Sequence, residues 1–203
     1  MDTIYENYIK YCHKRCDINE HLPTLRAYAS QSDSILELGT RGCVSAWAFA
    51  LGMLEGGGTH RVLIVNDITA CDVDELEDAI DKTSLTFKKY WQNDLTLQLG
   101  YNVDLVFIDT WHVYGQLIRE LEKFSKMTNK YMILHDIESF GYSGEPMNSE
   151  DVKQVMMEYK MSLEEVTMGL MPAVNHFLEI CGHEWTIKEV YTNNNGLLIL
   201  ERR

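Results

Sequence analysis

The most informative stretch of the sequence reads Ile35-Leu36-Glu37-Leu38-Gly39-Thr40-Arg41-Gly42-Cys43-Val44-Ser45. An apolar, strand-forming run comes first, a turn that contains glycine follows, and a helical pattern begins after it. Gly39 has no Cβ, so the backbone there can turn tightly and approach a ligand closely. The stretch lacks the Gly-x-Gly-x-x-Gly fingerprint of dinucleotide-binding enzymes, which argues against a nicotinamide dehydrogenase. It predicts a strand, a ligand-binding turn and a helix, with a plain strand-turn-helix unit as the alternative.

Short apolar runs alternate with helical patterns along the rest of the chain. Strands are predicted over residues 34–38, 61–66, 104–109 and 131–135, and helices over residues 45–54, 72–82, 114–127, 150–159 and 173–180. Residues 83–98 show no clear pattern. The chain closes on two β-rich runs, residues 185–191 and 197–201, joined by Asn193-Asn194-Asn195-Gly196. Asn-Gly between two such runs predicts a hairpin.

Helical patterns also cover the first thirty residues, with a break at Pro23 and a short helix over residues 24–30. Buried strands that alternate with helices predict a parallel sheet with helices on both faces. We therefore expect an α/β fold, a three-layer Rossmann-like sandwich whose mostly parallel sheet has about seven strands and a C-terminal antiparallel hairpin. Residues 1–203 are expected to form one domain, with a helical cap over residues 1–30 and a substrate-side loop and helix over residues 139–172.

Composition and charge exclude several classes of protein. The chain has a net charge of −13 and a pI of about 4.9. This charge repels a phosphate backbone, and no basic cluster with interleaved aromatic residues offsets it, so we expect no nucleic-acid partner. No secretory signal pattern begins the chain, and no apolar run reaches the roughly 20 residues that span a bilayer. The five cysteines are irregularly spaced, which favours reduced thiols in the cytoplasm, or in a host's cytoplasm for a viral chain.

Three further strand ends bear polar residues, and ligands bind at the carboxyl ends of strands in such sheets. Asn66-Asp67 ends the second predicted strand, where one carboxylate can accept hydrogen bonds from both hydroxyls of a ribose. A solvated turn is the alternative for Asp67. The third strand begins the run Asp104-Leu105-Val106-Phe107-Ile108-Asp109-Thr110-Trp111-His112-Val113-Tyr114, and the fourth ends in Ile133-Leu134-His135-Asp136.

Several of these motifs resemble one enzyme family. The turn at Gly39 resembles motif I of class I S-adenosylmethionine-dependent methyltransferases. Phe107-Ile108-Asp109, followed by His112 and Tyr114, resembles a motif of methyltransferase family 24, a group that includes small-molecule and sugar O-methyltransferases. The run that ends in Asp136 and the closing hairpin resemble the same group. The compact size and the C-terminal ending also resemble a rhamnose methyltransferase domain in a glycan-building protein of a large algal virus.

The resemblance implies S-adenosylmethionine as the cofactor. In this family the glycine turn accommodates the methionine part, an acid after the second strand binds the ribose, and an acid placed like Asp94 contacts the adenine amino group. Ser45, at the start of a helix, could cap that helix or bond the cofactor carboxylate. The cofactor-binding residues that we expect are Glu37, Gly39, Thr40, Arg41, Ser45, Asp67, Ile68, Asp94, Asp109 and Trp111.

The resemblance also implies a metal site. In the metal-dependent members, an aspartate after one strand and an acidic pair after the next bind a divalent cation. Asp109, His135 and Asp136 match those positions, and with waters they could hold Mg²⁺ or Mn²⁺. His135 stands in place of the first acid of the usual Glu-Asp pair. Capping of the strand ends is the alternative role for the two aspartates.

The chemistry of methyl transfer requires a nucleophile that is aligned with the cofactor and loses a proton. A sugar hydroxyl is a poor acid, so it needs a base or a metal that lowers its pKa. His112 and Asp109 are the candidate bases, and a neutral imidazole can accept a proton near pH 7. His112, Tyr142 and His176 are the candidate acceptor-binding residues, with ordinary packing as the alternative for each.

The sequence thus predicts an enzyme that transfers a methyl group from S-adenosylmethionine to a hydroxyl of a small molecule. A sugar in a glycan, such as rhamnose, is favoured as the acceptor. The alternatives are a catechol-type or other non-sugar O-methyltransferase and a non-catalytic cofactor-binding subunit that regulates a partner. A homo-oligomer is compatible with the sequence.

Overall fold

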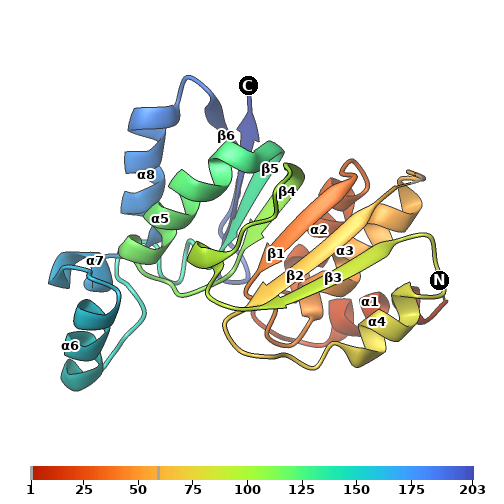
Figure 1. The fold of residues 1–203 in the computed structure, drawn as a ribbon, viewed down its shortest axis with the longest axis horizontal. Coiled ribbons are helices and arrows are strands. Elements are labelled where there is room, and N and C mark those ends of the chain that lie inside the picture. Colours follow the sequence, from red (N-terminus) through yellow and green to blue (C-terminus); the bar gives the residue numbers. More distant parts are fainter. Residues whose placement is uncertain (1, 59) are drawn as a thin grey trace.

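The computed structural model describes residues 2–58 and 60–203, which form one β-sheet and the helices around it (Figure 1). The helices are α1 (Asp2–His13), α2 (Leu22–Ala29), α3 (Val44–Glu55), α4 (Asp74–Ile80), α5 (Tyr114–Phe124), α6 (Ser149–Glu158), α7 (Leu163–Thr167) and α8 (Leu170–Cys181), with short 3₁₀-helices η1 (Asn19–His21), η2 (Asp94–Thr96) and η3 (Ser125–Met127). The strands are β1 (Ser34–Leu38), β2 (Val62–Asp67), β3 (Thr86–Trp91), β4 (Val103–Ile108), β5 (Thr128–His135), β6 (Trp185–Tyr191) and β7 (Leu197–Arg202).

The sheet orders its strands β3-β2-β1-β4-β5-β7-β6, a total of seven within the described ranges. Strands β1 to β5 are parallel, and β7 runs antiparallel to both β5 and β6. The predicted mostly parallel sheet with a C-terminal antiparallel hairpin is confirmed. Because β1 lies between β2 and β4, the order along the chain reverses beside it, and such a switch point opens a crevice at the carboxyl ends of the strands.

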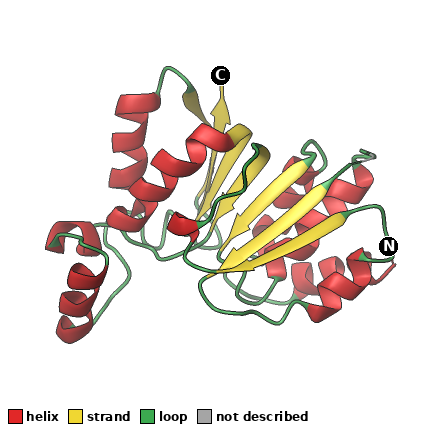
Figure 2. Cartoon of the chain, in the orientation of Figure 1, coloured by secondary structure: helices red, strands yellow, loops and turns green. Residues whose placement is uncertain are grey.

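Helices cover both faces of the sheet (Figure 2). In β4, Leu105 and Phe107 pack into a cluster with residues of α1 to α4, whereas Val106 and Ile108 pack into a cluster with residues of α5 and α8. Successive side chains of a strand point to opposite faces, so each buried strand serves two cores. The fold is therefore the predicted three-layer sandwich.

Two segments differ from the prediction. Pro23 lies in the first turn of α2 and begins that helix, where the sequence was expected to break one. A proline is tolerated there because the first-turn N–H groups have no partner within the helix. Residues 83–98, which showed no clear pattern, contain the edge strand β3 and the short helix η2. β3 lies at the edge of the sheet, with β2 as its one neighbouring strand among the described residues, and none of its side chains is fully buried, so its apolar pattern is weak.

The segment over residues 139–172 also holds more structure than one loop and one helix. It contains α6 and, beyond the predicted helix, the five-residue helix α7. Ser162 and Glu165 form a capping box that starts α7. In Figure 1, α6 and α7 stand outside the two helix layers, on the side where the parallel strands end.

Candidate active site

A cavity of about 780 Å³ opens at the carboxyl ends of β1, β2 and β4. Eight of the residues that the sequence predicted for the site line it: Gly39, Arg41, Asp67, Ile68, Asp94, Asp109, Trp111 and His112. They come from four separate strand ends or the loops after them. The parallel sheet brings them together because its strands end at one edge.

The turn at Gly39, which follows β1, packs against the backbone at the end of β4. Gly39 has a φ of +85°, in the left-handed region that favours glycine. A Cβ built on it would lie 1.9 Å from the carbonyl oxygen of Asp109. The missing side chain therefore lets the β1 turn pass against the backbone after β4. This close approach places the Asp109 carboxylate beside the turn.

Gly39→Ala is expected to lower the free energy of unfolding by at least about 2 kcal/mol, because the Cβ meets backbone atoms and the φ is strained. Urea denaturation measures the loss. Gly42→Ala is the matched control, since a Cβ there meets nothing within 4 Å. Equal losses in the two variants would contradict the packing role of Gly39.

Asp67, the last residue of β2, is an ionised carboxylate on the cavity wall. Its Oδ2 accepts a hydrogen bond from the backbone N–H of Arg41 at 3.0 Å, and its Oδ1 accepts one from that of Thr69 at 3.1 Å. Burial alone would raise the pKa of Asp67, but these backbone hydrogen bonds hold it below its ordinary value. A carboxylate has about four lone-pair sites, so it can accept further bonds from a ligand.

A cluster of two aspartates and two histidines lies at the other end of the cavity, where Asp109 and His112 form part of the wall. His112 Nε2 lies 2.9 Å from Asp136 Oδ2 and 3.5 Å from Asp109 Oδ1. His135 Nδ1 lies 3.3 Å from each of the same two oxygens. Glu145 adds a third carboxylate, whose Oε2 lies 3.2 Å from His112 Nδ1. The His112 ring stacks on Phe140, with 4.7 Å between ring centroids.

The charges of this cluster stabilise one another. Burial would lower the pKa of His112, but the hydrogen bonds with Asp109 and Asp136 outweigh it and raise that pKa to about 10. Burial would also lower the pKa of His135, but its hydrogen bonds with Asp109 and Asp136 raise that pKa to about 10. Burial raises the pKa of Asp136, yet its bonds with the two histidines bring it well below the ordinary value. In the absence of a cation, this pKa favours the protonated form of His112 at neutral pH.

A metal ion has a candidate set of ligands in this cluster. Asp109, His112 and Asp136 each offer one ligand atom, and these atoms lie within 4.8 Å of one another. Asp136 Oδ1 is buried and has no hydrogen-bond partner among the described residues. His135, which the sequence placed in the metal set, contacts the aspartates from the buried side. Its Nε2 faces the carbonyl oxygens of Asp17 at 3.1 Å and Asn194 at 3.3 Å.

Three predicted cofactor residues lie behind the cavity wall. Ser45 does not cap α3, because Cys43 occupies the N-cap position, and the Ser45 hydroxyl donates to Glu37 Oε1. Full burial raises the pKa of Glu37 to about 8, against a lowering by the Ser45 bond. Thr40 is also buried, and its hydroxyl donates to the carbonyl oxygen of Asn66 at 3.2 Å. These three side chains therefore form hydrogen bonds within the protein and do not line the cavity.

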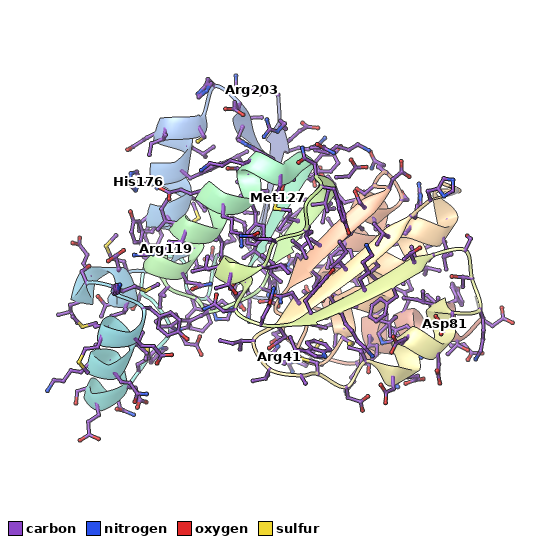
Figure 3. All side chains as sticks on the ribbon, in the orientation of Figure 1. Arg41, Asp81, Arg119, Met127, His176 and Arg203 are labelled. Atoms are coloured by element: carbon purple, nitrogen blue, oxygen red, sulfur yellow. The ribbon has the colours of Figure 1, made fainter. Side chains whose placement is uncertain are left out.

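Two predicted acceptor residues lie away from the cavity. Tyr142 is 81% exposed and is not part of the cavity lining. His176, on α8, accepts from or donates to the Tyr114 hydroxyl at 2.6 Å through Nδ1 and stacks on that ring. Figure 3 shows His176 on the far side of α5 from Arg41, which lies at the strand ends. Local sequence cannot show which side of a helix layer a residue reaches.

Some cavity residues come from the segment over residues 139–172. Glu145, Met147, Val155 and Tyr159 line the cavity, and the Tyr159 and Trp111 rings lie 6.3 Å apart. The sequence predicted a substrate-side loop and helix here, but no signal marked Glu145 or Tyr159. Their roles depend on how α6 docks, which is a tertiary property.

None of the helices in the described ranges is long and apolar enough to cross a membrane.

The fold recurs in solved methyltransferase structures, although no protein-family model and no curated protein sequence matches the chain. An S-adenosylhomocysteine-bound methyltransferase from Podospora anserina is 11% identical, with a TM-score of 0.59 over 100% of this chain and 88% of that one. An O-methyltransferase from Bacillus cereus in complex with S-adenosylhomocysteine is 13% identical, with a TM-score of 0.59 over 100% and 91%. A putative caffeoyl-CoA O-methyltransferase from Staphylococcus aureus is 14% identical, with a TM-score of 0.60 over 91% and 83%. The chain therefore has the α/β methyltransferase fold.

Proposed function

We propose that this protein is an S-adenosylmethionine-dependent O-methyltransferase that acts on a hydroxyl of a small molecule. The observation that supports this most is the 780 Å³ cavity at the switch point of the sheet, which joins the glycine turn and Asp67 to the cluster around Asp109 and His112. One end of the cavity thus offers hydrogen-bond acceptors for a nucleoside. The other end offers side chains that can accept a proton from the acceptor hydroxyl. The structures from P. anserina and B. cereus that share this fold contain the demethylated cofactor.

The residues of the cavity fit that cofactor. Asp67, Asp72, Asp94, Asp109 and Glu145 all line the cavity, and a cationic sulfonium is favoured in such an acidic environment. Ile68 is 61% exposed beside Asp67, so an adenosine that bonds Asp67 would also cover apolar surface. Arg41 lines the same wall and pairs with Asp17 at 2.6 Å.

A divalent cation also fits the residues present. Asp109 and Asp136 supply the hard oxygen ligands that Mg²⁺ and Mn²⁺ prefer, and His112 lies beside them as the base for the acceptor hydroxyl. Asp136 Oδ1 is a buried acceptor without a partner among the described residues, and a cation would satisfy it. When bound, such a cation lowers the pKa of a hydroxyl that contacts it. On the buried side of the cluster, His135 Nδ1 then contacts the carboxylates of both Asp109 and Asp136 and keeps them in place.

A sugar is the acceptor that we propose, in line with the resemblance to sugar and rhamnose methyltransferases. Trp111 and Tyr159 form an aromatic surface on the cavity wall, and Met147 and Val155 add apolar contacts from the segment over residues 139–172. Sugar C–H faces pack on aromatic rings, while Glu145 can accept bonds from sugar hydroxyls. A panel of deoxysugars and catechols, assayed with radiolabelled cofactor, tests this choice. Turnover of catechols alone would overturn it.

Asp67→Ala is expected to weaken binding of S-adenosylhomocysteine by about 1.5–3 kcal/mol, because charge-assisted bonds to the ribose are lost. This equals a rise in Kd of roughly 10- to 150-fold, which calorimetry measures. Asp81→Ala is the control, since Asp81 follows α4 outside the cavity and the substitution removes the same charge (Figure 3). No binding to the wild type, or equal affinity in the Asp67 variant, would overturn the cofactor assignment.

A further inference from the structure

A second polar cluster lies beneath the cavity, between α5 and the loop after β3. Its centre is Glu120 on α5, whose side chain is 0% exposed. Glu120 Oε1 accepts hydrogen bonds from the Thr110 hydroxyl at 2.6 Å and from Gln116 Nε2 at 2.7 Å. Glu120 Oε2 is buried too, and no donor reaches it within the described part of the chain. A charged carboxylate with one oxygen left bare in an apolar layer is strongly disfavoured.

The cluster reaches the cavity through Asp94. Gln116 Nε2 lies 3.2 Å from Asp94 Oδ1, so one amide contacts both acidic side chains. Asp94 is 8% exposed and lines the cavity, and the shared amide of Gln116 holds the carboxyl groups of Asp94 and Glu120 close to each other. The ammonium group of the neighbouring Lys123 donates to the backbone carbonyl oxygen of Asp94, at 2.6 Å, and not to either carboxyl group.

Two buried carboxyl groups in contact do not both ionise, because like charges at such a distance repel strongly. The proton belongs on the more buried partner, for which desolvation is the largest cause of a pKa well above the ordinary value of a glutamate. A protonated Glu120 gains a hydroxyl donor, and that donor satisfies both Asp94 and the otherwise bare Oε2. This assignment leaves the carboxyl oxygens of Asp94 as hydrogen-bond acceptors at the cavity wall.

We propose that Glu120 is a positioning residue that, as a neutral carboxylic acid, holds the Asp94 carboxylate toward the cavity and so selects a purine with an amino group over one with a carbonyl group. The inference rests on the proposed cofactor, whose adenine ring bears such an amino group. A carboxylate accepts a bond from an amino group but repels a carbonyl oxygen at the same place. Sites built around one hydrogen bond reject ligands that leave the buried group unpaired.

The test measures the affinities of S-adenosylhomocysteine and of its deaminated analogue, S-inosylhomocysteine, by calorimetry. We expect the wild type to prefer the adenosyl ligand by about 10- to 100-fold. Glu120→Gln should keep this preference, because its amide N–H donates to Asp94 while its oxygen accepts from Thr110 and Gln116. Glu120→Ala and Asp94→Asn should bring the preference below about 3-fold, since the first frees the Asp94 carboxylate and the second offers a donor as readily as an acceptor.

The outcomes separate this inference from the proposed function. A wild type that binds neither ligand overturns both, whereas one that binds both equally overturns only the role of the Glu120–Asp94 pair. An unchanged preference in Glu120→Ala would also overturn it. Should that variant fail to melt cooperatively, the isosteric Glu120→Gln decides: a lost preference there contradicts a neutral carboxyl. Infrared spectra at neutral pH supply a direct check, because the carbonyl band of a protonated carboxyl must disappear in Glu120→Gln.

Discussion

Alanine in place of His112 is expected to lower kcat by about 10²- to 10⁴-fold, the range typical for loss of a general base. His112 lines the cavity and contacts Asp136 at 2.9 Å, so it lies where an acceptor hydroxyl would lose its proton. Cofactor affinity should stay within a few-fold of the wild type, because Asp67 and the Gly39 turn occupy other strand ends. The measurements are kcat at saturating acceptor, calorimetry with S-adenosylhomocysteine, and a melting curve for each variant.

His176→Ala is the matched control, since His176 stacks on Tyr114 outside the cavity and should leave kcat near the wild-type value. A His112 variant with near-normal kcat would assign proton removal to Asp109 or to a metal-bound group. Loss of kcat together with loss of cooperative melting would instead show that the ion pairs of His112 are needed for folding.

The pH dependence of kcat follows from the raised pKa of His112. With a pKa of about 10, His112 is mostly protonated at pH 7 in the metal-free protein. Residual turnover without metal should therefore rise with pH until about pH 10. A cation beside Asp109 and Asp136 supplies positive charge in place of the proton and favours the neutral imidazole. The metal-loaded enzyme should thus reach its plateau at a lower pH.

Treatment with EDTA is expected to abolish turnover, and Mg²⁺ or Mn²⁺ should restore it. The reason is that Asp109 and Asp136 can ligate a cation beside His112, and that no partner among the described residues satisfies the buried Asp136 Oδ1. Asp136→Asn removes one negative charge from the ligand set, so this variant should need more metal for half-maximal activity. Cofactor binding in EDTA serves as the control, since the Asp67 end of the cavity does not involve the metal. Full activity in EDTA would show that His112 and His135 hold the aspartates without a cation.

The fold and the identity of the strand ends followed from local patterns. Each buried strand is a short apolar run, and Gly39, Asp67, Asp109 and Asp136 stand where such runs end, so their meeting at one edge follows from the parallel sheet. The edge strand β3 was missed because partial burial leaves a weak hydrophobic pattern. Pro23 was misread because proline breaks a helix inside it but begins one in its first turn.

The protonation and partners of the site residues depended on contacts between distant segments. His112 follows β4 and His135 ends β5, and packing turns His112 toward the cavity and seals His135 against the carbonyl oxygens of Asp17 and Asn194. The cluster of Asp94, Gln116 and Glu120 likewise joins η2 to α5, two elements that no periodicity relates. Periodicity reports which face of an element is apolar, and this suffices for strands, helices and their order. A pKa depends on burial and on charges a few ångströms away, and these are set only when the chain has packed.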